Sequence, residues 1–92
     1  MSASQAKKIE LCLYHTDHCH LCEQAEALCT AVLNPEFFAL ELCDIALQDV
    51  LMERYGVRIP VLQVKASGEE LGWPFDAEGL MAFLAPAAES LF

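Results

Sequence analysis

Two cysteines three residues apart, Cys19 and Cys22, stand between a segment with strand periodicity and a segment with helix periodicity. Before them, apolar and other side chains alternate over Ile9–Tyr14, which predicts a β-strand. After them, apolar residues recur at helical spacing, and a helix is expected from Cys19 to about Leu33, before Asn34 and Pro35. The side chains expected on its buried face are Leu21, Ala25, Leu28 and Val32.

Four further elements follow from the same kinds of pattern. Strands are expected at 37–44, 60–64 and 69–73, a short helix at 47–55, and a closing helix that Asp76 caps. In the short helix we expect Leu47, Val50 and Leu51 to face inward, with Gly56 in the left-handed conformation of a C-cap. Leu80, Phe83 and Leu84 should face inward in the closing helix, which Pro86 should interrupt.

The order βαβαββα predicts an α/β fold, in which the first two strands are parallel and the last two form a hairpin. The expected result is a four-stranded mixed sheet with helices on both faces. A chain of 92 residues fits one domain, 1–92, with a flexible N-terminus at 1–7 and a C-terminal tail at 86–92.

Net charge excludes several classes of partner. The chain carries 14 acidic and five basic residues, a net charge of −9, so its surface should repel nucleic acid and anionic membranes. No apolar run reaches the roughly 18 residues of a membrane-spanning helix, and no signal peptide is recognised. We expect a cytoplasmic monomer.

The chain has five cysteines, an odd number, and no secretion signal. A structural disulfide framework is therefore not expected. Cys12 and Cys43 are interpreted as small buried residues in strands. Cys29 is interpreted in the same way on the first helix, with a backup thiol role as the second interpretation.

A cysteine at a helix N-terminus has a chemical use. Unpaired N–H groups and the helix dipole stabilise a thiolate there, which lowers the thiol pKa and makes Cys19 the expected nucleophile. Cys22, in the first turn of the same helix, can attack a mixed disulfide on Cys19 and release the substrate. Protonated His20 would add positive charge beside the thiolate.

Other interpretations of the same residues stay open. The dithiol could be an unused relic of an active fold. It could also form half of a zinc site with His15, His18 and His20, although a closed zinc site usually draws its ligands from two separated pairs, and the chain has no second C-x-x-C motif. A third hypothesis is a binding module without catalysis, whose cleft holds a partner peptide or a metal. No cofactor or metal is expected.

The sequence resembles the glutaredoxin-like members of the thioredoxin fold, and most closely a family of small bacterial glutaredoxin-like proteins of uncharacterised function. The segments that carry the resemblance are Tyr14-His15-Thr16-Asp17-His18-Cys19-His20-Leu21-Cys22 and Arg54-Tyr55-Gly56-Val57-Arg58-Ile59-Pro60-Val61-Leu62. It covers about Ile9 to Leu84.

The resemblance implies the sheet order 2-1-3-4 and a thiol–disulfide oxidoreductase that acts on protein or small disulfides. It implies a cis bond at Pro60, facing the dithiol, with Ile59 and Pro60 presenting backbone to substrate. The glycine pair that helps glutaredoxins bind glutathione is replaced by the segment 72–76, where only Asp76 could serve as the acidic residue. Glutathione binding is therefore expected to be weak. Trp73 and Phe75 are expected to cover the end of the core; an apolar rim for a partner is the alternative.

Overall fold

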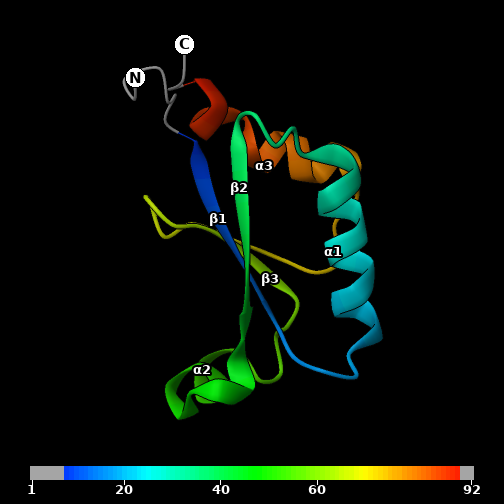
Figure 1. Ribbon diagram of the computed structural model, residues 1–92, viewed down its shortest axis with the longest axis vertical. Helices are drawn as coiled ribbons and strands as arrows, with labels where there is room; N and C mark the ends of the chain where they lie inside the picture. The colour runs from blue at the N-terminus through cyan, green and yellow to red at the C-terminus, as the bar shows by residue number, and fades with distance from the viewer. Residues whose placement is uncertain (1–7, 90–92) are drawn as a thin grey trace.

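The computed structural model describes residues 8–89, which form one mixed sheet and its helices (Figure 1). The elements are β1 (Ile9–His15), α1 (His20–Val32), β2 (Phe38–Asp44), the 3₁₀ turn η2 (Ile45–Leu47), α2 (Asp49–Tyr55), β3 (Val61–Val64), β4 (Glu70–Gly72) and α3 (Ala77–Glu89). The predicted strands and the first helix differ from these bounds by one residue at one end or at both. The expected flexible N-terminus, 1–7, lies outside the described residues. Of the expected tail 86–92, residues 86–89 belong to α3 and residues 90–92 lie outside the described residues.

The sheet has the order β2-β1-β3-β4, as the resemblance to the thioredoxin fold implied. β1 runs parallel to β2 and antiparallel to β3, and β3 and β4 form the hairpin. Because side chains alternate along a strand, this register gives the sheet two chemically different faces. Leu11, Leu13, Leu62 and Val64 point to one face, while Cys12, Tyr14, Val61 and Gln63 point to the other.

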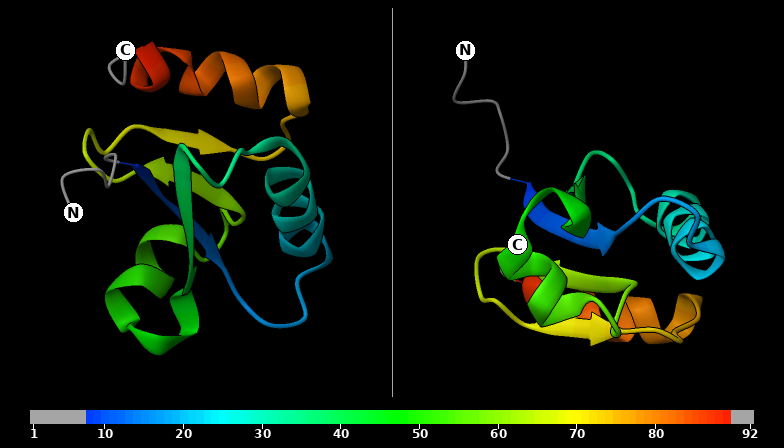
Figure 2. Two further views of the ribbon diagram at one scale, coloured as in Figure 1. Left: turned by 45° about the horizontal axis from the view of Figure 1, so that its top comes forward. Right: turned by 90° about the horizontal axis from the view of Figure 1, so that it is seen from below.

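The larger core lies on the first of these faces. Leu11, Leu13 and Leu62 are fully buried there, together with Cys29 of α1 and Leu80 of α3. Figure 2 shows α1 and α3 beside one another, with α2 at a separate part of the sheet. Trp73 and Phe75 also pack against this core, in edge-to-face contact with their ring centroids 5.0 Å apart, so they cover the core as expected.

A smaller core lies on the second face, beneath α2. Ile45, Tyr55 and Val61 are buried in it, with Tyr14 and Leu51 packed against them. Helices therefore lie on both faces of the sheet, as predicted, but α2 has only seven residues and belongs to this smaller cluster.

The structure corrects the prediction for the segment 47–56. Leu47 and Val50 are 79% and 68% exposed, and Tyr55 takes the inward position instead, one turn after Leu51. Gly56 has φ −53° and ψ −36°, which is right-handed helical backbone, not a left-handed cap. The turn after α2 is closed by two hydrogen bonds instead. The backbone N–H groups of Arg58 and Ile59 both donate to the Tyr55 carbonyl.

Two predictions for the longer helices are also wrong. Leu21 is 47% exposed, and Cys22 is buried in its place; the other predicted positions hold, since Ala25 is buried and Leu28 and Val32 pack against the core. Pro86 does not interrupt α3, which continues to Glu89. Proline there lacks the N–H that would bond the Ala82 carbonyl, but both residues are exposed, so water can satisfy that carbonyl. No helix within residues 8–89 is long and apolar enough to cross a bilayer.

Candidate dithiol site

Cys19 caps the N-terminus of α1. Its backbone is extended, with φ −110° and ψ 101°, and its Sγ accepts a hydrogen bond from the backbone N–H of Cys22 at 3.2 Å. Its carbonyl accepts the N–H of Glu23 at 3.1 Å, which is the first bond of the helical ladder. The sulfur thus lies among the unpaired N–H groups at the positive end of the helix dipole, where a thiolate is stabilised.

The two cysteines are joined as a disulfide, with their Cα atoms 5.2 Å apart. They differ in access to solvent: Cys22 is only 3% exposed, whereas Cys19 is half-buried. A substrate sulfur can therefore reach Cys19 more easily than Cys22. This asymmetry suits one attacking and one resolving thiol.

The histidines lie in and beside the loop that leads to Cys19. His15 ends β1 and is half-buried, while His18 and His20 are exposed. His18 has φ +60°, a left-handed conformation that histidine adopts more readily than most residues, and it turns the chain just before Cys19. Within residues 8–89, no three His, Cys, Asp or Glu side chains gather in a way that could hold a metal ion.

Ile59 and Pro60 precede β3, and the bond between them is cis, as predicted. Pro60 is buried, and its carbonyl accepts the N–H of Trp73 at 3.2 Å. The Ile59 N–H donates to the Tyr55 carbonyl at 3.1 Å. The packing of Pro60 against the dithiol stays a prediction, as does a substrate contact. A second cis bond, Trp73–Pro74, was not expected from the sequence.

Asp76 begins α3 and caps it as predicted. Its Oδ1 accepts the N–H of Gly79 at 2.8 Å, and its carbonyl accepts the N–H of Leu80 at 2.8 Å. The cap explains why this residue stands at this position. A role for its carboxylate toward substrate stays a prediction.

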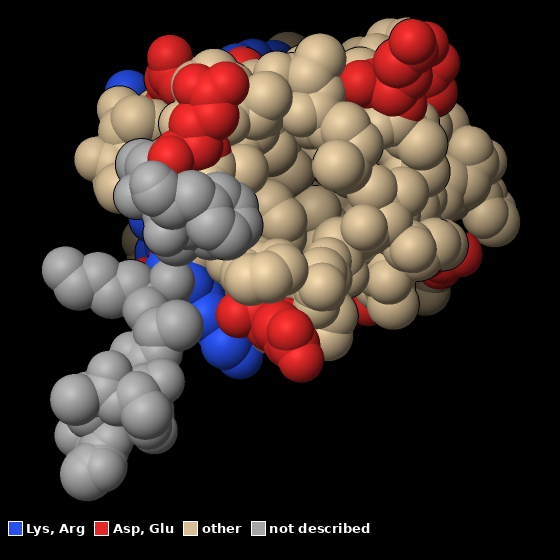
Figure 3. All heavy atoms as spheres, turned by 90° about the horizontal axis from the view of Figure 1, so that it is seen from above, with Lys and Arg blue, Asp and Glu red and all other residues tan. Residues whose placement is uncertain are grey.

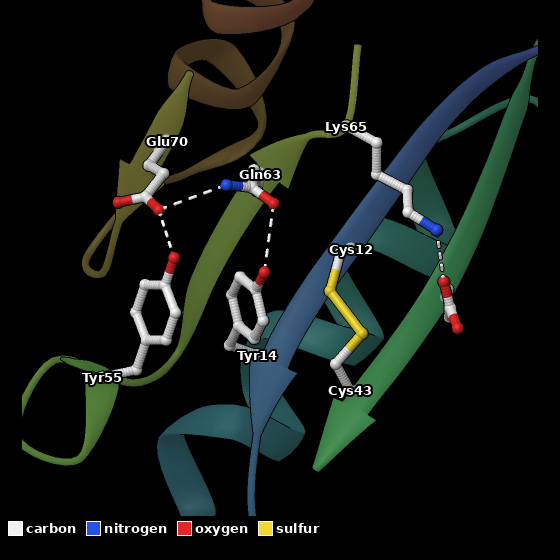
Figure 4. Close-up of a disulfide and its surroundings, with 8 residues drawn as sticks. Cys12, Tyr14, Cys43, Tyr55, Gln63, Lys65 and Glu70 are labelled. Carbon is white, nitrogen blue, oxygen red and sulfur yellow. Dashed lines mark hydrogen bonds and ion pairs between the residues drawn. A yellow bond between two sulfur atoms is a disulfide. The ribbon is translucent and has the colours of Figure 1, made fainter. Parts of the chain in front are cut away.

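A second disulfide joins Cys12 of β1 to Cys43 of β2 (Figure 4), and it corrects the interpretation of both residues as unpaired thiols. Cys12 is buried as expected, whereas Cys43 is only half-buried. In the parallel register Tyr14 lies opposite Cys43 and Cys12 lies opposite Glu41, so both cysteines point to the same face. Their Cα atoms are 6.3 Å apart. The alternation of side chains along each strand could have predicted that the two cysteines share a face. The cysteine count and the expected cell compartment, on which the interpretation rested, carry no information about the face.

Cys29 is the free cysteine among the described residues, and it is buried as expected. Burial raises the pKa of its thiol from 9.0 to about 11, with a smaller contribution from the negative charge of Glu26. Since a thiol must ionise to react, Cys29 is protected from exchange at neutral pH.

A polar network that the sequence analysis missed extends over the second face (Figure 4). The Tyr55 hydroxyl donates to Glu70 Oε2 at 2.5 Å, and the Arg58 guanidinium donates to Glu70 Oε1 at 2.8 Å. The Tyr14 hydroxyl donates to Gln63 Oε1 at 3.1 Å. The hydrogen bond from Tyr55 is the main cause that lowers the Glu70 pKa, with Arg58 adding to it; burial is the main cause that raises the Tyr55 pKa.

These contacts also occupy the basic side chains that follow the first helix. Arg58 pairs with Glu70, and Lys65 Nζ lies 2.7 Å from Glu41 Oε1. The Arg54 guanidinium lies 5.9 Å from the centre of the Tyr55 ring. The face seen in Figure 3 is mostly uncharged, with acidic side chains toward its margins. Arg58 and Lys65 thus each have a carboxylate partner within the protein.

Comparison with known proteins gives similarities in both sequence and fold. The family model of the Glutaredoxin-like domain (DUF836) matches residues 10–85. Among solved structures, the X-ray structure of the structural genomics target protein XcR50 from X. campestris is 44% identical with a TM-score of 0.70, and the match covers 83% of this chain and 96% of that one. The NMR structure of protein Ne2328 from Nitrosomonas europaea is 28% identical with a TM-score of 0.70, covering 87% and 95%. A search of curated proteins finds no significant match.

Proposed function

The chain belongs to the glutaredoxin-like domain family, and from that premise we propose that it is a thiol–disulfide oxidoreductase. The observation that carries the proposal is the position of Cys19, which caps α1 and is more open than its partner Cys22. A sulfur at this position is stabilised as a thiolate and can be reached by a substrate, and a resolving thiol lies one helical turn away.

The reaction proceeds in two exchanges. The Cys19 thiolate attacks one sulfur of a substrate disulfide, forms a mixed disulfide with it, and releases the other substrate sulfur as a thiolate. The Cys22 thiol then loses its proton, and its sulfur attacks Cys19 Sγ, which re-forms the Cys19–Cys22 bond and releases the second substrate thiolate. Two electrons pass from the dithiol to the substrate, and an external thiol reductant restores the dithiol.

We propose protein disulfides as the substrate class in preference to glutathione mixed disulfides. Glutathione carries two carboxylates, and Arg58 and Lys65 already pair with Glu70 and Glu41. A protein segment can bind through backbone contacts next to Pro60 instead. Because the Ile59 N–H already donates to Tyr55, Ile59 would contact such a segment through its carbonyl.

The test is reduction of insulin disulfides by the protein with dithiothreitol as reductant, followed as turbidity. Wild type and Cys29→Ser should accelerate the reaction, and Cys19→Ser should not. Cys22→Ser should form a stable mixed disulfide on Cys19 that mass spectrometry can map. Equal rates for wild type and Cys19→Ser, with no adduct on the Cys22→Ser variant, would favour a binding module over an enzyme.

A further inference from the structure

Within residues 8–89, a helix packs on the second sheet face at one end only. α2 packs beside Tyr14 and Val61, and beyond Tyr14 this face carries the Cys12–Cys43 disulfide. The disulfide joins the central strand β1 to β2, which is an edge strand of the sheet. No helix of the described chain forms part of a core around this pair, as α1 and α3 do around Cys29.

The two sulfurs of this disulfide differ in access. Cys12 is 2% exposed, although no helix of residues 8–89 belongs to a core around it. In Figure 4 the Tyr14 ring lies beside Cys12 along β1, and the Lys65 side chain crosses β1 to meet a carboxylate on β2, which is Glu41. Cys43, nearer the end of the edge strand, is half-buried and more open to an incoming thiolate.

We propose that Cys12 and Cys43 form a second thiol–disulfide exchange site, whose reaction partners are small thiols and dithiols that attack Cys43. An incoming thiolate bonds to Cys43 Sγ, the Cys12–Cys43 bond breaks, and the Cys12 sulfur leaves and takes up a proton. The second thiol of a dithiol reagent then attacks the mixed disulfide and releases the Cys43 thiolate. The protein disulfide gains two electrons and the reagent becomes a disulfide.

The sheet makes this exchange reversible without unfolding. The register of β1 and β2 fixes the two Cα atoms 6.3 Å apart, within the range that a disulfide spans. Reduction breaks one covalent bond but leaves the backbone pairing that holds the two thiols together. Their high effective concentration favours closure again when the disulfide form of the reagent takes back the two electrons by the reverse exchange.

The two disulfides exchange independently. Cys12 and Cys43 point to the second face, whereas Cys22 belongs to α1, which packs against the first. The sheet therefore separates the pairs, and each must react with external thiols by itself. Reduction of each disulfide takes two electrons, so the described chain would accept four electrons when both are reduced. This inference does not depend on the oxidoreductase activity proposed for Cys19.

The first test is a titration of the native protein in dithiothreitol buffers of graded potential, with alkylation and mass spectrometry of each pair. We expect a Cys12–Cys43 transition in the folded protein, and the same transition in Cys19→Ser/Cys22→Ser. If the pair is reduced only in denaturant, the disulfide is purely structural and the proposal fails. It also fails if the pair is never oxidised in the native protein. The measured quantity is the oxidation state of Cys12 and Cys43. The result can therefore be interpreted even if the protein does not reduce insulin.

The second test identifies the attacked sulfur with a matched pair of variants. Cys12→Ser leaves Cys43, and Cys43→Ser leaves Cys12, so each presents one of the two thiols. Incubation with oxidised glutathione should modify Cys43 at least about tenfold faster than Cys12 in the folded proteins, because only the more open sulfur reacts readily. Equal rates, or a faster reaction at Cys12, would contradict the assignment. Circular dichroism confirms that both variants are folded.

Discussion

The aromatic ring of Tyr14 stacks on that of Tyr55, with ring centroids 4.1 Å apart and an angle of 15° between the planes. The contact joins the central strand β1 to the last residue of α2, and the Tyr55 ring is also within 5.2 Å of the Arg58 guanidinium. This stack fixes where α2 sits on the second face. It thereby leaves the Cys12–Cys43 pair, next to Tyr14 on the same face, outside the helix-covered part of the sheet.

The Tyr55 hydroxyl gives the first prediction. Tyr55→Phe keeps the stack and removes the hydrogen bond to Glu70, so the free energy of unfolding should fall by about 1–2 kcal/mol. The Tyr55 bond is the main cause of the lowered Glu70 pKa, and this stabilisation is present above the unfolded pKa and lost as pH falls through the folded pKa. Urea unfolding at pH 7 and at pH 3 should therefore show a smaller difference between the two proteins in acid.

Tyr14→Phe is the matched control for this variant. It also keeps the stack, but its hydroxyl bonds the neutral Gln63 and not a carboxylate. It should lower stability less than Tyr55→Phe does and leave the acid dependence unchanged. A Tyr55→Phe protein as stable as wild type at pH 7 would show that the Glu70 contact contributes nothing net.

The second prediction concerns Cys29 at alkaline pH. Its folded pKa of about 11 lies above the unfolded 9.0, so the protonated thiol stabilises the fold below pH 9, and this contribution is lost as pH rises through 11. By pH 10.5 the unfolded state should gain about 2 kcal/mol from thiol ionisation. Cys29→Ala should therefore lose less stability than wild type between pH 8 and pH 10.5 in chemical denaturation. Parallel pH curves for the two proteins would contradict the prediction.

The third prediction separates two roles of Asp76. Asp76→Ala removes the cap on the Gly79 N–H and should cost about 1 kcal/mol in thermal or urea unfolding. Asp76→Asn keeps a capping oxygen and removes the charge, so its stability should stay near that of wild type. If Asp76→Asn nevertheless slows insulin reduction, the carboxylate also acts toward substrate. If only Asp76→Ala has any effect, the residue acts as a cap alone.

Local patterns predicted much of this fold. Alternation located β1, and the Cys19–Cys22 spacing between a strand and a helix located the dithiol, because both signals lie within a few consecutive residues. The Cys12–Cys43 disulfide depends on the register of two strands whose cysteines are 31 positions apart, which no local window contains. The same holds for Tyr55 and Glu70, which meet only after β3 and β4 pair.

The prediction of which side chains of α2 face inward is wrong for a different reason. Over seven residues a helix makes about two turns, so a few apolar side chains fit more than one inward face. Val50 was placed inside on apolar character alone. Tyr55 occupies the inward position instead, because its aromatic ring buries more surface and stacks on the ring of Tyr14.

The fourth prediction concerns glutathione. With Arg58 and Lys65 paired to carboxylates, glutathione should lack charge-assisted hydrogen bonds that cost about 1.5–3 kcal/mol each when absent, or roughly ten- to a hundredfold in affinity. The wild type should therefore reduce a glutathione mixed disulfide poorly in a glutathione-coupled assay, while it reduces insulin measurably. Robust turnover of the glutathione mixed disulfide would make the protein a working glutaredoxin.

The last prediction concerns which thiol reacts first in the fully reduced protein. Cys19 is the half-buried cap of α1, and its sulfur should have a lowered pKa because the helix N-terminus stabilises the thiolate. Cys22 is 3% exposed, and burial raises the Cys29 pKa to about 11, so both should react slowly at pH 7. Timed alkylation with iodoacetamide under anaerobic conditions, mapped by mass spectrometry, should label Cys19 about tenfold faster than any other cysteine. Labelling of Cys29 or Cys43 first in the folded protein would remove Cys19 from the nucleophilic role, since the reaction order reports thiolate character and access together.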